Sequence, residues 1–171
     1  MSIREVITYP NPILRKKSEV VEEINEDLKQ LVEDMAETMY GLHGIGLAAV
    51  QIGILRRLIV VNVGEGLVVV VNPVIDEAAG ETRMEEGCLC LPEVMVEVTR
   101  HETVTVSGLS ETGQEVTLHA DGLLARALQH EIDHLEGTLI VDKVSRLKRE
   151  LLTSALRRIK YHRCFHVHII K

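Results

Sequence analysis

Two histidines spaced by four residues, with a glutamate beside the first, form a pattern that can bind a metal ion. They stand in His130-Glu131-Ile132-Asp133-His134, after a run rich in helix-forming residues at 122–128. Residues i and i+4 share one face of a helix, so both histidines can reach one metal, and the glutamate stays free to move protons. Because five residues are a short pattern, the alternative is an amphipathic helix whose histidines face solvent or packed partners.

A third metal ligand is expected upstream, because catalytic zinc-type sites take three protein ligands and keep one position open. The best candidate is Cys88, in the segment Glu85-Glu86-Gly87-Cys88-Leu89-Cys90-Leu91-Pro92-Glu93. The alternative is that Cys88 and Cys90 are small buried hydrophobic residues, as free cysteines usually are.

A glycine-rich segment at 43–53 offers close approach of its backbone to another group. Gly44 and Gly46 carry no side chain, and Gln51 supplies an amide at the segment's edge. A phosphate-binding loop fits poorly, since no Lys-Ser/Thr pair follows. The alternative is an ordinary turn before a strand.

Composition predicts a cytosolic chain with one domain covering 1–171. It has 171 residues, 46% of them apolar and 26% charged, which is typical of a globular protein. Charges stand near Met1 where a signal peptide needs an apolar run, and polar residues and glycines interrupt the apolar stretch 58–71, so no membrane segment is expected. Three cysteines without framework spacing indicate a reducing compartment.

Periodicity predicts an α+β fold, with antiparallel or mixed sheets packed around the helix that carries the two histidines. Asn25 is expected to cap an N-terminal helix that runs to Tyr40, and Asp121 to cap the central one. A C-terminal helix is expected to open near Arg146, after a cap at Asp142 or Ser145, with one leucine-rich stripe that must pack. Short strands are predicted at 58–63, 67–72, 94–98, 103–107 and 115–118, with Pro73 closing the second.

The C-terminal region is strongly basic. From Val144 to Lys171, Glu150 is the sole acidic residue among many arginines and lysines, whereas the whole chain has a net charge of −7. This imbalance suggests an anionic partner such as nucleic acid, or alternatively a solvated helix face.

Three motifs occur in an order that resembles the peptide deformylase family: Gly44-Ile45-Gly46-Leu47-Ala48-Ala49-Val50-Gln51, Glu86-Gly87-Cys88-Leu89-Cys90 and His130-Glu131-Ile132-Asp133-His134. The family patterns are G-x-G-L-A-A-x-Q, E-G-C-L-S and H-E-x-D-H, and the resemblance runs from about Val6 to about Lys160. It implies a hydrolase that removes the formyl group from the N-terminal formylmethionine of newly made polypeptides and releases formate.

The resemblance also implies roles for individual residues. Cys88, His130 and His134 would hold one divalent metal, Fe2+ in most members, with Zn2+, Ni2+ or Co2+ able to occupy the site. Hydroxide on the metal would attack the formyl carbon, with Glu131 as general acid and base. The oxyanion would be bound by the side chain of Gln51 and the backbone N–H of Leu89.

Substrate-binding positions follow from the motifs and from the helix near the metal. The apolar pocket for methionine is expected to draw on Ile45, Leu123 and Ala127, and Gly46 is expected to accept the substrate backbone. The full set is Gly44, Ile45, Gly46, Glu86, Gly87, Leu123 and Ala127. The expected partners are N-formylmethionyl nascent peptides and, through the basic C-terminal helix as in some relatives, the ribosome.

Supporting contacts are predicted around the ligands. Glu86 is expected to orient either Gln51 or a metal ligand, and Asp133 to anchor its helix through a basic residue such as Arg100.

Some positions depart from the family patterns. Cys90 stands where the family has serine, so it would either replace a packed hydroxyl or compete for the metal, and Val50 stands where proline is common. The tail 161–171 has no recognised counterpart, and its alternating residues suggest an edge strand or, through Cys164, His166 and His168, a surface metal site.

Two other functions remain open from the sequence. One is a zinc peptidase of the H-E-x-x-H class, whose third ligand usually lies downstream, where Glu136 is too close and Glu150 would need a favourable turn. The other is a catalytically silent relative that only binds formylated peptide ends or ribosomes.

Overall fold

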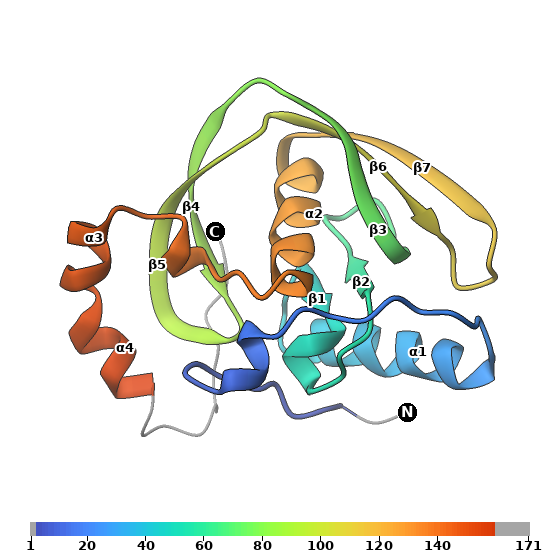
Figure 1. Ribbon diagram of the computed structural model, residues 1–171, viewed down its shortest axis with the longest axis horizontal. Helices are drawn as coiled ribbons and strands as arrows, with labels where there is room; N and C mark the ends of the chain where they lie inside the picture. Colours follow the sequence, from blue (N-terminus) through green and yellow to red (C-terminus); the bar gives the residue numbers. More distant parts are fainter. Residues whose placement is uncertain (1–2, 160–171) are drawn as a thin grey trace.

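Two antiparallel sheets flank a central helix in the computed structural model, which describes residues 3–159 (Figure 1). One sheet has five strands in the order β1-β2-β3-β6-β7, and the other pairs β4 with β5. This arrangement confirms the predicted α+β class. The strands are β1 (Gly46–Ala48), β2 (Leu58–Val61), β3 (Val68–Ala79), β4 (Thr82–Cys88), β5 (Leu91–Arg100), β6 (Thr103–Leu109) and β7 (Glu115–Asp121).

The helices begin close to the predicted residues. The Asn25 side chain accepts a hydrogen bond from the backbone of Leu28 and caps the first helix, as predicted. Asp121 directly precedes the central helix, but its carboxylate makes no capping hydrogen bond. The helices are α1 (Glu26–Gly41), α2 (Gly122–Leu135), α3 (Arg146–Leu151) and α4 (Thr153–Ile159), with short 3-10 turns at Pro12–Arg15, Ala49–Ile52 and Ile140–Asp142. None of the helices within 3–159 is long and apolar enough to span a membrane.

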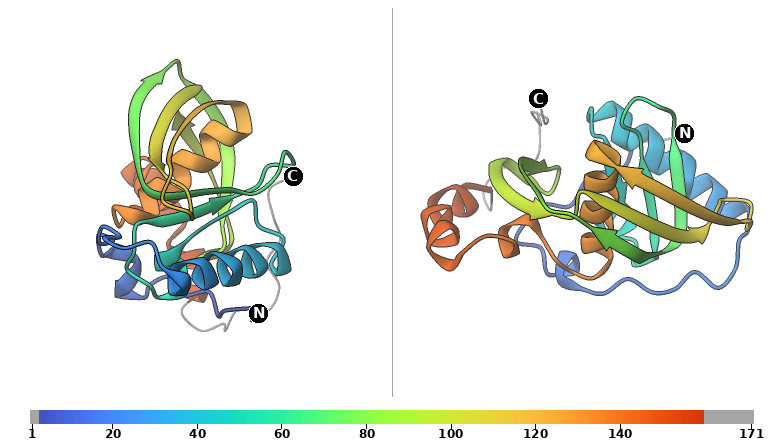
Figure 2. Two further views of the ribbon diagram at one scale, coloured as in Figure 1. Left: turned by 90° about the vertical axis from the view of Figure 1, so that its right-hand side faces the viewer. Right: turned by 90° about the horizontal axis from the view of Figure 1, so that it is seen from above.

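Strand β2 is buried on both faces, which explains its uninterrupted apolar sequence. Leu58 and Val60 point into the core beneath α1, whereas Ile59 and Val61 point into the core beneath α2. Successive strand residues face opposite sides of a sheet, so one short strand serves both cores. The two helices thus cover opposite faces of this part of the large sheet (Figure 2).

Strand β3 continues past Pro73, contrary to the prediction that this proline closes the strand. The register with β6 shifts between Val71 and Val74, and Asn72 has a positive φ of 53°. Such a bulge accommodates a proline, which cannot donate a ladder hydrogen bond. The Asn72 side chain fixes the bulge by hydrogen bonds to the backbone N–H and C=O of Val21.

The hairpin of β4 and β5 carries the cysteine motif, and sequence analysis missed its first strand. Strand β5 alternates buried apolar residues with exposed ones, such as Val96 and Glu97. Strand β4 has no such apolar alternation, because its fully buried side chain is the carboxylate Glu86. Period-two hydrophobicity therefore could not reveal β4, although it revealed β5.

The C-terminal helix is divided in two, and its apolar stripe packs only in part. The Thr153 hydroxyl donates to the Arg149 carbonyl at the break, an interaction that bends helices. Leu151 on α3 is 74% exposed, whereas Leu156 on α4 packs into the core beside β5. Ser145 provides the predicted cap of α3. The tail 161–171, with its predicted edge strand and surface metal site, lies outside the described residues.

Because Leu156 is buried and Leu151 is exposed, replacing each by alanine should lower the free energy of unfolding by different amounts. Leu156→Ala should lower the free energy of unfolding by roughly 2–3 kcal/mol, because it leaves a cavity in the core. Leu151→Ala should change it by no more than about 0.5 kcal/mol, because that side chain is exposed. Urea unfolding at a fixed metal concentration measures both. Equal losses would show that α3 packs as firmly as α4.

Candidate metal centre

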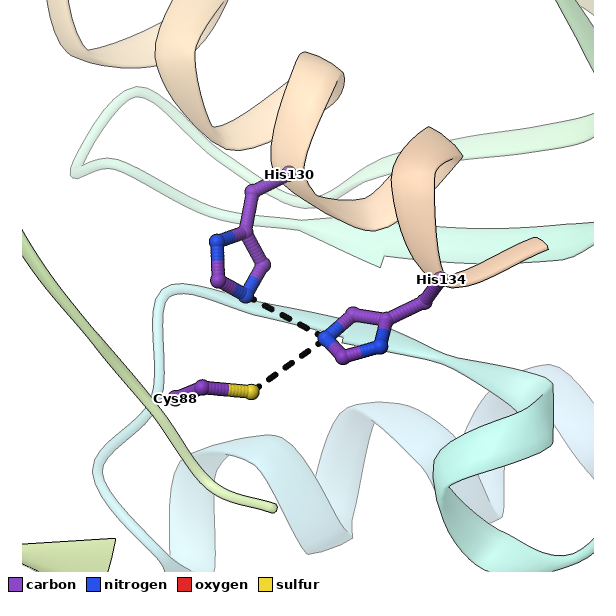
Figure 3. Close-up of side chains that lie close together, drawn as sticks. All are labelled: Cys88, His130 and His134. Carbon is purple, nitrogen blue, oxygen red and sulfur yellow. Dashed lines mark hydrogen bonds between the residues drawn. The ribbon is translucent and has the colours of Figure 1, made fainter. Parts of the chain in front are cut away.

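Three potential metal donors meet where the end of β4 faces α2. The Nε2 atom of His134 lies 3.2 Å from Sγ of Cys88 and 3.2 Å from Nε2 of His130 (Figure 3). The two histidines lie on one face of α2, as their spacing predicts, and the cysteine reaches them from the strand. All three donor atoms lie within 4.8 Å of one another.

The chemistry of this cluster fits a divalent metal. Two imidazole nitrogens and a sulfur point at a common space, an arrangement that direct hydrogen bonds among them satisfy poorly. Without a cation, a hydrogen bond with Cys90 and burial raise the pKa of the Cys88 thiol to about 11. Since a coordinating thiol is deprotonated, a metal held here would reverse that preference. Three donors leave a fourth position for water or substrate.

Glu86 orients one of these ligands. Its Oε2 atom lies 3.0 Å from Nδ1 of His130, while Arg100 donates to both of its oxygens and Arg126 donates to Oε1. Burial alone would raise the pKa of Glu86, but hydrogen bonds from His130 and Arg100 bring it to about 2. The carboxylate is thus ionised and fixes the His130 ring with Nε2 toward the cluster. Glu86 was predicted to orient either Gln51 or a metal ligand, and in the structure it contacts the potential ligand His130.

Asp133 anchors α2 through Arg100, as predicted. The guanidinium donates to Oδ2 of Asp133 at 2.8 Å, and Lys143 lies 3.1 Å from the other oxygen. Arg100 therefore connects the strand β5 to both the helix and Glu86.

Glu131 lies in the same site, and its side chain is buried. Its Oε2 atom is buried and has no hydrogen-bond partner within 3–159, and burial raises the pKa of its carboxyl to about 7. Gly46 lies directly against it, since a Cβ there would overlap the carboxylate. A side chain at this position would therefore displace the Glu131 carboxylate, which connects the glycine-rich segment to the histidine motif.

Gln51 is buried beside the cysteine motif. Its Oε1 atom accepts a hydrogen bond of 2.7 Å from the backbone of Ala48, which turns the amide nitrogen toward the sulfurs. That nitrogen lies 3.4 Å from Sγ of Cys90 and 3.8 Å from Sγ of Cys88. Cys90 is fully buried and lies outside the group of three potential donors, which favours the packed position over competition for the metal.

A pocket opens beside the cluster. Each residue predicted to bind substrate lines it, as do Cys88, Leu89, Gln51, His130 and Glu131. Sequence analysis missed three further lining residues, Met84, Glu85 and Arg126. The first two belong to the unpredicted strand β4, and the third stands on α2 four residues before His130, a spacing that marks the same helix face.

The structure does not support a third ligand downstream of the histidines. Glu136 pairs with Arg57 and Lys17, and Glu150 pairs with Arg146 on the exposed helix α3. The third donor that joins His130 and His134 within 3–159 is Cys88. This overturns the ligand set required by the peptidase alternative.

Comparisons with known proteins agree with this geometry. Residues 3–150 match the family model described as polypeptide deformylase. A peptide deformylase from Thermodesulfovibrio yellowstonii is 52% identical over 156 residues, covering 88% of this chain and 94% of the relative. The crystal structure of a peptide deformylase from Legionella pneumophila is similar with a TM-score of 0.89 and 42% identity, covering 93% of this chain and 96% of that one.

A peptide deformylase from Ehrlichia chaffeensis, solved in complex with actinonin, also matches with a TM-score of 0.89 and 37% identity, covering 94% of this chain and 97% of that one. The family model covers most of the chain, and the relatives are matched over nearly their full length. The chain belongs to the peptide deformylase family of metal-dependent hydrolases.

Proposed function

We propose that this chain holds one divalent metal ion with Cys88, His130 and His134. As a peptide deformylase, it removes the N-formyl group from newly made peptides. The observation that carries the assignment is the convergence of these three donors beside Glu131 in one pocket. We propose Fe2+ as the physiological metal, with Zn2+, Ni2+ or Co2+ as substitutes, because a thiolate and two imidazoles suit all of them. When bound, the metal lowers the pKa of a coordinated water towards ~7 and polarises the formyl carbonyl.

Glu131 moves the proton in the proposed reaction. Its buried carboxyl, with a pKa of about 7, can exist in either protonation state near neutral pH. It takes a proton from the attacking water and passes it to the amine that leaves when the formamide C–N bond breaks. Gly46 leaves room for this carboxylate to reach the reacting atoms.

The oxyanion that forms during attack needs hydrogen-bond donors that are already in place. The side-chain amide of Gln51 and the backbone N–H of Leu89 are our candidates, because both residues line the pocket beside Cys88. The bond from Ala48 fixes the amide orientation in advance. One such donor contributes roughly 3 kcal/mol to transition-state stabilisation.

The pocket wall supports a preference for an apolar first side chain. Ile45, Leu123 and Ala127 line it, with Met84 at its exposed edge. We propose that these residues receive the methionine side chain, while Gly44, Gly46 and Gly87 allow the substrate backbone to approach closely.

We further propose that 1–171 act as one catalytic domain in the cytoplasm, where formylated chains emerge from ribosomes. The ligands of the proposed metal come from both β4 and α2, so the site requires the small sheet and the central helix together. The basic helices α3 and α4 lie at one edge of the molecule and offer a surface for ribosomal RNA (Figure 1).

Replacing Glu131 by glutamine should separate metal binding from catalysis. Glu131→Gln keeps the side-chain shape but removes the proton carrier, so formate release from formyl-Met-Ala-Ser should fall by roughly 10³-fold. Bound metal should remain equal to that of the parent chain. A parent chain that binds metal without turnover would instead support the catalytically silent relative.

Replacing each cysteine in turn tests the ligand assignment. Cys88→Ala should weaken metal binding by at least about 100-fold, as loss of a ligand exceeds the effect of an outer contact. Cys90→Ala is the matched control, because it removes a neighbouring thiol that lies outside the donor cluster, and it should retain the metal. Competition with a chromophoric chelator measures both. Tight binding by Cys88→Ala would return support to the peptidase class.

Reversing two charges on α4 tests the ribosome contact. Both Arg157 and Arg158 are exposed, so Arg157→Glu with Arg158→Glu should weaken binding to purified ribosomes at least about tenfold and reduce its salt dependence. Lys29→Glu on α1 is the control, and turnover of free formyl-Met-Ala-Ser should not change in either protein. Unaltered ribosome binding by the double variant would assign these charges to a solvated surface.

A further inference from the structure

A buried arginine on α2 has no role in the reaction described above. Arg126 is 3% exposed, and its guanidinium faces the network around Glu86. We propose that Arg126 is a positioning residue, which holds Glu86 so that His130 and Cys88 stay at the spacing required by one metal ion. The proposal rests on the metal ligands assigned above.

Arg126 connects α2 to both strands of the small sheet. Its Nη1 atom lies 2.6 Å from Oε1 of Glu86 and 3.1 Å from the carbonyl oxygen of Val98 on β5. Its Nη2 atom donates to the carbonyl oxygen of Thr82 at the start of β4. A planar guanidinium has donors in a fixed fork, so these contacts together define the distance between the helix and the hairpin.

Through the helical spacing, the contact between Arg126 and Glu86 also affects the orientation of His130. Arg126 and His130 are four residues apart, so their side chains lie on the same face of α2. Glu86 bridges the two side chains. One of its carboxylate oxygens accepts a hydrogen bond from Arg126, and the other lies 3.0 Å from Nδ1 of His130. Rotation of the carboxylate would therefore turn the imidazole, whose Nε2 faces the other donors.

Cys88 follows Glu86 by two residues on β4, so the same contact also sets the position of the sulfur. Arg100 differs from Arg126, because it belongs to β5 and divides its donors between Glu86 and Asp133. Arg126 stands on α2 itself and bonds Glu86 directly, whereas Arg100 reaches the same helix through Asp133.

A merely structural role would lower stability without altering the metal site, and Gln129 provides a control for that case. Gln129 is also buried on α2, and its side chain bonds to the backbone N–H and C=O of His101 next to β5. Gln129→Leu therefore removes hydrogen bonds between α2 and the residue that follows β5, without affecting a contact of Glu86.

The first experiment loads the full chain with Co2+ and records the visible spectrum and the dissociation constant. Arg126→Met should bind Co2+ at least about tenfold more weakly than the parent and show shifted ligand-field bands, because loss of an outer-shell partner disturbs its ligand. Arg126→Lys, which keeps the charge but lacks the fork, should show a smaller loss and serves if Arg126→Met does not fold. Gln129→Leu should lower the melting temperature while leaving both cobalt readouts unchanged.

A double-mutant cycle with Glu86→Gln then tests whether Arg126 acts through Glu86. Adding Arg126→Met to Glu86→Gln should cost less than about twofold in further Co2+ affinity, because the shared contact is already lost. Losses that multiply, or an Arg126→Lys protein with the parent's cobalt spectrum and affinity, would overturn the proposal. Failure of the parent chain itself to bind Co2+ would instead overturn the ligand assignment.

Discussion

A carboxylate buried to 1% exposure is strongly destabilising unless its charge is compensated, and Glu86 occupies such a position. Arg100 and Arg126 neutralise it from β5 and α2, and the remaining contact is made with the His130 ring. The network therefore fixes the hairpin, the helix and the imidazole relative to one another. The metal centre depends on it, because the sulfur and the two histidines come from elements that no shared backbone ladder joins.

The large sheet positions the helix α2 that takes part in this network. Because β2 is buried on both faces, α1 and α2 are held at opposite sides of one layer, and neither can shift without opening a core. The close approach of Gly46 to Glu131 is a product of that packing, since β1 lies directly under α2. The proposed proton carrier thus takes its position from the hydrophobic core as well as from its own helix.

Short sequence patterns were sufficient to predict many features of the site. A spacing of four residues places His130 and His134 on one helix face wherever that helix packs, and the asparagine cap and apolar periodicity locate α1 for similarly local reasons. Three motifs in order identified the family that the comparisons then showed. Strands with alternating or continuous apolar residues, such as β5 and β2, were also within reach of sequence analysis.

The tertiary structure decided what depends on residues distant in the chain. Strand β4 escaped detection because its buried side chain is Glu86, whose burial is tolerated only beside the arginines of β5 and α2. The continuation of β3 past Pro73 required Asn72 to bond with Val21, and the exposure of Leu151 depended on where α4 met the core. The sequence by itself determined the residue types and spacings that could bind a metal. Only packing determined which charges could be buried together, because that energy belongs to contacts between separate elements.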